Sequence, residues 1–449
     1  MLEQSELFDL SKKHLVGKLV TSNVSSGMIE EIVFPDEGQF KHILVLSASD
    51  FATCPKIDIM NESIPVFASD KVSYKGQPIL AVFGYETEDV DLFCKEVKIS
   101  YQIQPDSEDY KSIQYSDPFI WSFGSTDDYF TDQAKVFKSS FEVSPYPKQM
   151  LGDQRIFAVE SESYMNIRVA SQWPIHVRKS VAKALGASIS DVLIYPYAYY
   201  APYDQLILQP SILSAFVAMA AKQSGELVEL SYPVLSYQPK LSMTHETAYL
   251  EDGTPIADKS SCTIDLGAFP IFTEEICHNI LAGMISVYPL KAAEVSITIL
   301  KSTTMPANFF GDLGYSMALA GTENHFSSLA ASLGIQPGIW KKERVHEIIQ
   351  KGSHICQAVK EGSDFSKLEK TLTDIMESSW YSRKYAANTQ KALFKGKMNP
   401  LVNYSRGIAI AVGDGIMGFS QQFNANAKYN LTIIMKENGT LVVNTGMNC

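Results

Sequence analysis

The stretch that decides the fold is "IRVASQWPIHVRKSVAKALGASISDVLIYPYAYYAPYDQLILQP", residues 167–210. It begins with an alternating apolar run that is typical of a strand. Val177, Val181 and Leu185 then recur at helical spacing, and Gly186 is placed to end that helix. Residues 191–197 predict a second strand, and after a turn an apolar helix is predicted through about residue 225. The order strand, helix, strand, turn, helix predicts α/β layers.

The flanking sequence predicts two domains. Short strands alternate with turns over residues 14–107, and the stretch "PDSEDYKSIQYSDP" at 105–118 is polar and acidic. We therefore predict a first domain over 1–107, a linker over 108–130 and a second domain over 131–449. Further on, the sequence predicts a hairpin at Asp252-Gly253, helices over much of 315–397, and strands at 405–413 and 429–446.

Composition excludes several classes of protein. The chain has 449 residues, 45% of them hydrophobic and 20% charged, which is a globular balance with room for two or more domains. A net charge of −12 disfavours binding to nucleic acid or to an anionic membrane. The most apolar window, residues 206–222, is interrupted by Gln209 and Pro210 and indicates a buried helix rather than a membrane span. Six scattered cysteines and a polar N-terminus without a signal sequence favour a cytoplasmic protein.

Six stretches of the chain, taken in order, follow the pattern of a known family. They are 72–105, 167–196, "TIDLGAF" at 263–269, 323–337, 405–412 and 437–446. Together they resemble the large, molybdenum-binding subunit of the xanthine dehydrogenase / aldehyde oxidase family, and the resemblance runs from about residue 14 to the end of the chain. It implies an α/β (α+β) fold in which a small hammerhead-like domain precedes the first lobe of a molybdopterin-binding domain. In active members this lobe helps to hold a molybdenum–pterin cofactor that hydroxylates a heterocycle or an aldehyde.

The turn at 198–205 departs from this family. Its members carry G-G-G-F-G-G-K-E there, because glycine lets backbone N–H groups approach a bulky anionic cofactor. The present chain has tyrosine rings instead, a proline without an N–H, an aspartate in place of the lysine and a glutamine in place of the active-site glutamate. Each change opposes cofactor binding. The residues are Ala198, Tyr199, Tyr200, Ala201, Pro202, Tyr203, Asp204 and Gln205.

Two further departures concern substrate and chemistry. The family's substrate-holding arginine falls on Gly311 in "NFFGDLGYSM", with Asp312 next to it. The glutamate base of the family belongs to a further lobe, and the sequence ends at Cys449, before that lobe. Gln172 alone matches a family position that reaches toward the molybdenum ligands, so it is the candidate cofactor-binding residue. The competing interpretation is a strand-end glutamine bonded to nearby backbone.

Other candidate sites are weaker. Cys277 and His278 could meet His354 and Cys356 as a zinc site, but the spacing within each pair is poor and we expect no metal. His176 is expected on a solvated helix face. No nucleophile elbow, dinucleotide-binding fingerprint or phosphate-binding loop occurs, so we name no catalytic residue.

Three functional hypotheses remain. The first is an oxidoreductase-like pseudoenzyme that has no cofactor on this chain alone and a structural or assembly role. The second is the N-terminal half of a split molybdenum hydroxylase. The third is a module that binds a new small ligand in a tyrosine-lined cleft. Expected partners are a second-lobe, iron–sulfur or flavin subunit, or another copy of the chain, with no nucleic acid and no membrane. The altered turn favours the first hypothesis over the second, because truncation alone does not require it.

Overall fold

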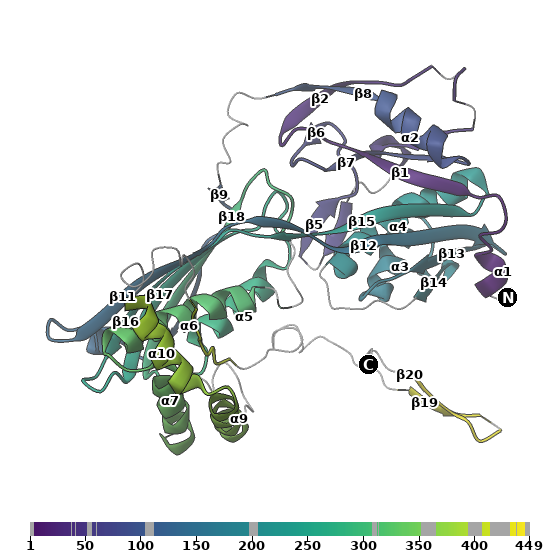
Figure 1. The fold of residues 1–449 in the computed structure, drawn as a ribbon. Helices are drawn as coiled ribbons and strands as arrows, with labels where there is room; N and C mark the ends of the chain where they lie inside the picture. The colour runs from purple at the N-terminus through teal and green to yellow at the C-terminus, as the bar shows by residue number, and fades with distance from the viewer. Residues whose placement is uncertain are drawn as a thin grey trace.

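The structure is a computed structural model, and Figure 1 shows the arrangement of its elements. It describes residues 4–36, 38–40, 42–51, 56–59, 61–103, 112–196, 205–307, 312, 314–351, 365–393, 406–413, 432–436 and 438–444. Helices and sheets are mixed along the chain, which confirms the predicted α/β class.

The larger sheet has seven strands in the order β14-β13-β12-β15-β1-β7-β3. It combines strands from two distant parts of the sequence. β1 pairs in parallel with β15, Leu15–Gly17 against Val228–Leu230, and this short pairing joins the two halves. The strands are β1 (Leu15–Thr21), β3 (Leu44–Leu46), β7 (Pro78–Gly84), β12 (Tyr146–Ser161), β13 (Tyr164–Val169), β14 (Val192–Pro196) and β15 (Val228–Gln238).

Two helices pack on this sheet. α3 (Pro174–Leu185) buries Val177 and Val181 and ends at Gly186, whose φ of 62° is the left-handed conformation that glycine adopts without strain. α4 (Gln205–Ser224) carries fully buried side chains over 215–218. The predicted order strand, helix, strand, helix is confirmed by β13, α3, β14 and α4, and the apolar window is a buried helix. Across the part of the chain that the structure describes, no helix is long and apolar enough to cross a membrane.

The N-terminal region adds a small sheet, a hairpin and two helices around this sheet. A three-stranded sheet holds β6 (Lys71–Val72), β2 (Gly27–Val33) and β8 (Lys98–Gln102), and a hairpin holds β4 (Lys56–Ile59) and β5 (Glu62–Pro65). α2 (Thr87–Glu96) covers β1 and β7, and the short α1 (Gln4–Leu7) precedes β1. Phe67 stacks on Phe216 of α4 with ring centroids 4.1 Å apart. The N-terminal region therefore shares its core with α4.

The second sheet follows the order β10-β18-β17-β16-β11, with β9 also paired to β18. β9 (Ile113–Gln114) and β10 (Phe119–Phe123) lie in the range predicted as a linker, and the domain boundaries stay a prediction. α5 (Thr273–Ile285) and α6 (Tyr315–Ser332) pack together on this sheet. A Cβ on Gly283 would lie 2.8 Å from the Tyr315 carbonyl oxygen, so glycine allows that close approach. The other strands are β11 (Lys135–Val143), β16 (Leu241–Tyr249), β17 (Pro255–Asp265) and β18 (Ala292–Lys301).

The C-terminal part is helical and ends in a hairpin. α7 (Pro337–Lys351), α9 (Phe365–Ser378) and α10 (Tyr381–Leu393) confirm the helix-rich prediction where the chain is described. β19 (Thr432–Met435) and β20 (Leu441–Asn444) pair as expected around Gly439, which has a φ of +79°. The hairpin at Asp252-Gly253 between β16 and β17 is likewise confirmed.

The strand predicted over 405–413 is wrong for its described part, because residues 406–413 form none. Their backbone groups bond side chains of α6 and α7 and of Ser286, which follows α5, instead of an adjacent strand. Lys341 Nζ donates to the Ile410 carbonyl at 2.8 Å, and the Val412 amide donates to Glu323 Oε2 at 2.6 Å. An apolar pattern alone cannot distinguish a paired strand from an extended segment held in this way.

The charges that hold this segment are themselves buried. Lys341 is fully buried and Glu323 nearly so, and their Nζ and Oε2 atoms lie 2.7 Å apart. The Tyr288 hydroxyl donates to the other oxygen of Glu323. Because every charged atom has partners, the pair is tolerated, whereas removal of one member would leave an uncompensated buried charge.

We predict that Lys341→Met lowers the free energy of unfolding by about 3 kcal/mol, the range found when one partner of a buried pair is removed. Deprived of its partner, Glu323 should also hold the Val412 amide less well, so hydrogen exchange at that amide should become faster. Urea denaturation and exchange mass spectrometry measure the two effects. Lys342→Met is the matched control, and an equal loss of stability in both variants would contradict the assignment.

Candidate functional site

Gln172 lies where the family resemblance places it, between the end of β13 at Val169 and the start of α3 at Pro174. It is partly buried, and it follows the buried Ser171, whose hydroxyl accepts from the Trp173 amide at 2.9 Å. β13 and β14 are parallel, and Val169 pairs with Pro196. The C-terminal ends of β13 and β14 therefore lie at the same edge of the sheet, where ligands of α/β proteins commonly bind, and Gln172 follows the end of β13. A role for Gln172 in cofactor binding stays a prediction.

The expectation that His176 lies on a solvated helix face is wrong. His176 is buried, and its Nε2 lies 2.8 Å from the Asp58 carbonyl oxygen, so Nε2 carries the proton. Nδ1 then accepts from the Ser211 hydroxyl at 2.7 Å. Burial lowers the pKa of His176, which favours this neutral form. The ring joins α3 to α4 and β4, and Trp173 stacks on it at 4.1 Å. The periodicity of α3 did not reveal this because the neighbours come from distant segments.

The turn that departs from the family lies outside the described residues. Its borders are described: β14 ends at Pro196 and α4 begins at Gln205. The predicted connection between a strand and a helix therefore has the expected ends.

The stretch 263–269, which resembles the family, meets residues 304–307 at the ends of β17 and β18. Gly267 has a φ of +76°, and a Cβ there would lie 2.3 Å from the Met305 carbonyl oxygen. Backbone bonds from Ala268 to Thr304 and from Ala307 to Leu266, both close to 3 Å, fix the two segments together. Glycine is thus needed at this position for close packing.

Asp312 marks the start of α6. Its carboxylate accepts from the backbone amides of Gly314 and Ser316, both at 3.1 Å, and from the Ser316 hydroxyl. A carboxylate in this position satisfies free N–H groups of the first turn and complements the helix dipole. Asp312 therefore caps a helix beside the position where the family has an arginine. Gly311 itself lies outside the described residues.

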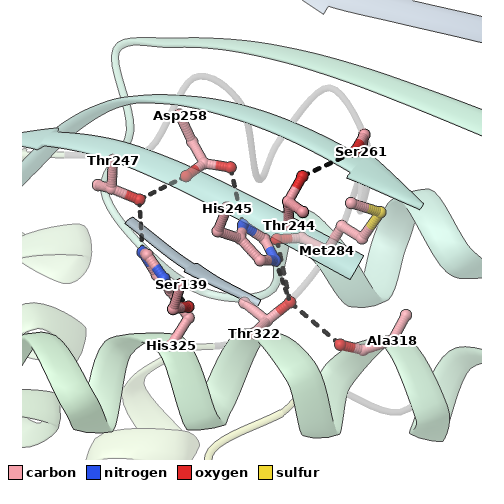
Figure 2. Close-up of polar contacts among 10 residues, drawn as sticks. All are labelled: Ser139, Thr244, His245, Thr247, Asp258, Ser261, Met284, Ala318, Thr322 and His325. Carbon is pink, nitrogen blue, oxygen red and sulfur yellow. Dashed lines mark hydrogen bonds and ion pairs between the residues drawn. The ribbon is translucent and has the colours of Figure 1, made fainter. Parts of the chain in front are cut away.

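A polar network that sequence reasoning missed lies between the second sheet and α6 (Figure 2). His245, Thr247 and Asp258 come from β16 and β17, and His325 comes from α6. All four side chains are at most 2% exposed. His245 Nδ1 lies 3.0 Å from Asp258 Oδ2, and His325 Nε2 lies 2.8 Å from Thr247 Oγ1. No motif signals this cluster, because strand pairing and helix packing bring its members together.

The donor and acceptor of each hydrogen bond in this network follow from the charge of the Asp258 carboxylate. An ionised Asp258 only accepts, so it takes a proton from His245 Nδ1 and from the Thr247 hydroxyl. Thr247 then accepts from His325 Nε2, which leaves His325 Nδ1 to accept from the Ser139 hydroxyl at 2.6 Å. Each of these hydrogen bonds therefore has one defined donor and one defined acceptor when the His325 ring is neutral.

The pKa values agree with this ordering. Burial alone would raise the pKa of Asp258, but the neighbouring His245 and the hydrogen bonds to the carboxylate hold that pKa below its usual value. Burial and the nearby His245 lower the pKa of His325 to about 3. A histidine of such low basicity is a poor general base for Ser139 at neutral pH. The arrangement cross-links strands to a helix and does not form a hydrolytic site.

The zinc candidates do not come together in the described part of the chain. Cys277 is buried in α5, and burial raises the pKa of its thiol, which disfavours the thiolate that a metal needs. His278 contacts the Phe119 ring at 5.2 Å. His354 and Cys356 lie outside the described residues. Within those residues, no group of three or more His, Cys, Asp or Glu side chains is placed to hold a metal ion.

Comparison with known proteins identifies the family. The model of the molybdopterin cofactor-binding domain matches residues 108–343, more than half of the chain. The chain belongs to this family. Among curated relatives, aldehyde oxidase 3 of Mus musculus is 22% identical over 97% of this chain and 34% of its own length. Aldehyde oxidase 2 of Rattus norvegicus is 19% identical over 65% of this chain and 23% of its own length.

Solved structures show the same fold. Quinoline 2-oxidoreductase from Pseudomonas putida 86 superposes with a TM-score of 0.75 at 14% identity, over 97% of this chain and 59% of that one. Carbon monoxide dehydrogenase from Oligotropha carboxidovorans gives 0.71 at 16% identity, over 86% and 53%. The chain thus spans little more than half the length of these enzymes and about a third or less of the curated relatives.

The network predicts that acid destabilises the protein. His325 has a pKa of about 3 when folded and an ordinary value near 6.5 when unfolded, so protons bind preferentially to the unfolded state between these values. The free energy of unfolding should therefore fall below pH 6.5, by up to about 1.4 kcal/mol per pH unit from this group. Asp258 also has a lowered pKa in the folded protein, so it further reduces the free energy of unfolding only at more acidic pH.

Urea denaturation at several pH values between 7 and 4 measures the slope of the free energy of unfolding against pH. His325→Gln should reduce the slope, because it removes the group whose pKa is lowered on folding. An unchanged slope in the His325 variant would contradict the account of the network.

Proposed function

We propose that this chain has no molybdenum–pterin cofactor and no catalysis of its own, and that it serves as a structural or assembly subunit beside a related polypeptide. The observation that carries this proposal is the connection between β14 and α4. Eight residues, 197–204, lie between Pro196 and Gln205, and none of them is glycine.

The residues of this connection do not fit an anionic pterin. Backbone N–H groups can surround such a cofactor only where side chains leave room, and Tyr199 and Tyr200 add bulk while Pro202 has no N–H to donate. Asp204 adds a negative charge where the family resemblance places a lysine. The carboxylate of Asp312, which caps α6, supplies another negative charge beside the position of the family's arginine.

An assembly role is supported by the β19–β20 hairpin. Figure 1 shows this hairpin apart from the other elements, and its apolar side chains are exposed, with Ile433 at 59%, Met435 at 73% and Leu441 at 60%. A two-stranded hairpin is at best marginally stable alone in water. Exposed apolar strands of this kind are typical of surfaces that another chain covers.

The cofactor proposal is tested on the purified chain after expression in a host that makes molybdopterin. We expect no stoichiometric molybdenum by elemental analysis and no pterin fluorescence after acid oxidation, whereas an intact family enzyme from the same host gives both. Stoichiometric molybdenum in the chain alone would refute the proposal. Molybdenum that appears only after co-expression with a polypeptide carrying a second lobe of this family would support the alternative of a split hydroxylase.

The assembly proposal predicts that the chain self-associates or binds a partner at micromolar concentration. Sedimentation velocity and co-purification measure this. Ile433→Lys should weaken the association because it places a charge in the exposed apolar hairpin. Ile175→Lys is the matched control, since Ile175 is 67% exposed on α3. A monomer without partners, or equal effects of both substitutions, would count against the hairpin.

A further inference from the structure

β11 is an edge strand of the second sheet. One side of it pairs with β16 along its whole length, from Lys135 opposite Tyr249 to Val143 opposite Leu241. On its other side, no strand in the described part of the chain pairs with it. Such an edge presents backbone N–H and C=O groups that can pair with another chain, and proteins commonly keep their edge strands short or covered. The nine residues of β11 exceed the usual strand length of about five or six.

A row of alternating charges crosses the exposed face of this sheet and ends on β11. Lys138 lies opposite Glu246 of β16, Glu246 opposite Lys259 of β17, and Lys259 opposite Glu294 of β18. The row therefore ends with a lysine at the edge of the sheet. A carboxylate in the next position, beyond that edge, would continue the alternation of sign.

A second copy of β11 supplies that carboxylate. When two identical strands pair antiparallel about a two-fold axis, positions at equal distances from the axis lie opposite each other. With the axis at Ser140, Lys138 of each copy lies opposite Glu142 of the other. An axis at Lys138 or at Glu142 would place like charges opposite each other, which destabilises a strand pair. Because Glu142 is the only acidic residue of β11, no other axis within the strand opposes these two charges.

The charges of Lys138 and Glu142 stay accessible to a second copy. Lys138 Nζ lies 2.8 Å from Glu246 Oε2, and Glu142 Oε1 lies 3.3 Å from Lys240 Nζ. The side chains of Lys138 and Glu142 are nevertheless 66% and 57% exposed. An ammonium group has three donors and a carboxylate has about four acceptor positions, so a further ion pair forms without breaking these. Exposed ion pairs of this kind contribute little affinity, but they select the register.

The inner face of β11 fits the same register. Phe137, Phe141 and Val143 are only partly buried, and the Phe137 ring contacts the His325 ring of α6 at 5.2 Å. With the axis at Ser140, Phe137 of one copy lies opposite Val143 of the other. Aromatic and β-branched side chains in opposite positions stabilise a strand pair. Pairing would therefore also cover apolar surface that a single copy leaves partly exposed.

We propose that the chain forms a two-fold symmetric dimer in which β11 pairs antiparallel with β11 of a second copy, centred on Ser140. The second sheet then continues from one copy into the other. Backbone hydrogen bonds supply most of the affinity, and the ion pairs between Lys138 and Glu142 set the register. One strand pair is a small interface, so the dimer is reversible, with a dissociation constant in the micromolar range. The proposal goes beyond the proposed function and uses neither the 197–204 connection nor the β19–β20 hairpin.

Charge reversal tests the register on the full chain. All variants carry Ile433→Lys, so that the β19–β20 hairpin contributes little to the association. Lys138→Glu and Glu142→Lys should each weaken the dimer about tenfold, because each places like charges opposite each other. An equimolar mixture of these two variants should dimerise about as tightly as the parent, because every opposed pair again has opposite signs. Sedimentation velocity across micromolar concentrations measures the dissociation constants.

Lys135→Glu is the matched control for the change in net charge. Lys135 lies on the same strand and is exposed, but with the axis at Ser140 it faces Pro145 of the second copy, which carries no charge. This variant should dimerise nearly as tightly as the parent. Circular dichroism and the urea midpoint establish that each variant is folded, and recovery of the dimer in the mixture gives a second check.

Cross-linking locates the axis independently. Position 140 of one copy should lie directly opposite position 140 of the other, with β-carbons about 5 Å apart. A short bis-maleimide should therefore link Ser140→Cys chains into covalent dimers. Ser122→Cys is the matched control, because Ser122 is an exposed serine on β10, at the other edge of the same sheet. The parent chain gives the background from the native cysteines.

Three results would overturn the proposal. The first is a parent chain that remains monomeric at hundreds of micromolar. The second is a mixture of Lys138→Glu and Glu142→Lys that associates no more than either variant alone. The third is Ser140→Cys that cross-links no faster than Ser122→Cys. None of these results bears on the molybdenum content of the chain or on the hairpin.

Discussion

The structure depends on the burial of α4 between two parts of the chain that are far apart in sequence. The face formed by Phe216 and its neighbours packs against the N-terminal region through Phe67 and against the seven-stranded sheet. Each fully buried side chain of this size contributes roughly 1.5–3 kcal/mol. The three-residue pairing of β1 with β15 sets the register of this contact. Since the pairing is short, the same arrangement that joins the two halves also leaves a cavity of about 630 Å³ beside them, which residues of both strands line.

In the second sheet, buried polar groups fix how the helices dock. Asp258 orients two histidines between β16, β17 and α6, and Glu323 with Lys341 holds the segment 406–413. Buried charges add little net stability compared with apolar residues of the same shape, but they penalise every arrangement in which they lose a partner. Neither network includes a residue of β13 or β14. The scaffold features that match the family, such as Gly186 and Gly267, serve packing and helix termination.

The sequence predicted most of the elements but few of the contacts. Val177, Val181 and Gly186 were sufficient for α3, and Asp252-Gly253 was sufficient for the β16–β17 hairpin, because local spacing and turn conformation decide these features. The strand predicted at 405–413 is wrong for its described part. An alternating apolar pattern does not show which groups form hydrogen bonds with the backbone amides and carbonyls of the segment. His176 was misplaced for a related reason, since its partners Asp58 and Ser211 come from other segments. The network around His325 and the cavity between β1 and β15 had no signal in the sequence at all.

The sequence by itself determined the α/β class, the family resemblance and the chemical character of the 198–205 turn. These properties follow from residue type and order: glycine, proline, tyrosine and aspartate differ in what a backbone or a ligand can do at one position. The tertiary structure alone decided which side chains meet. It joined β1 to β15 and closed the Asp258 network between β16, β17 and α6. Such contacts depend on the register of strands and the docking of helices, which local sequence does not specify.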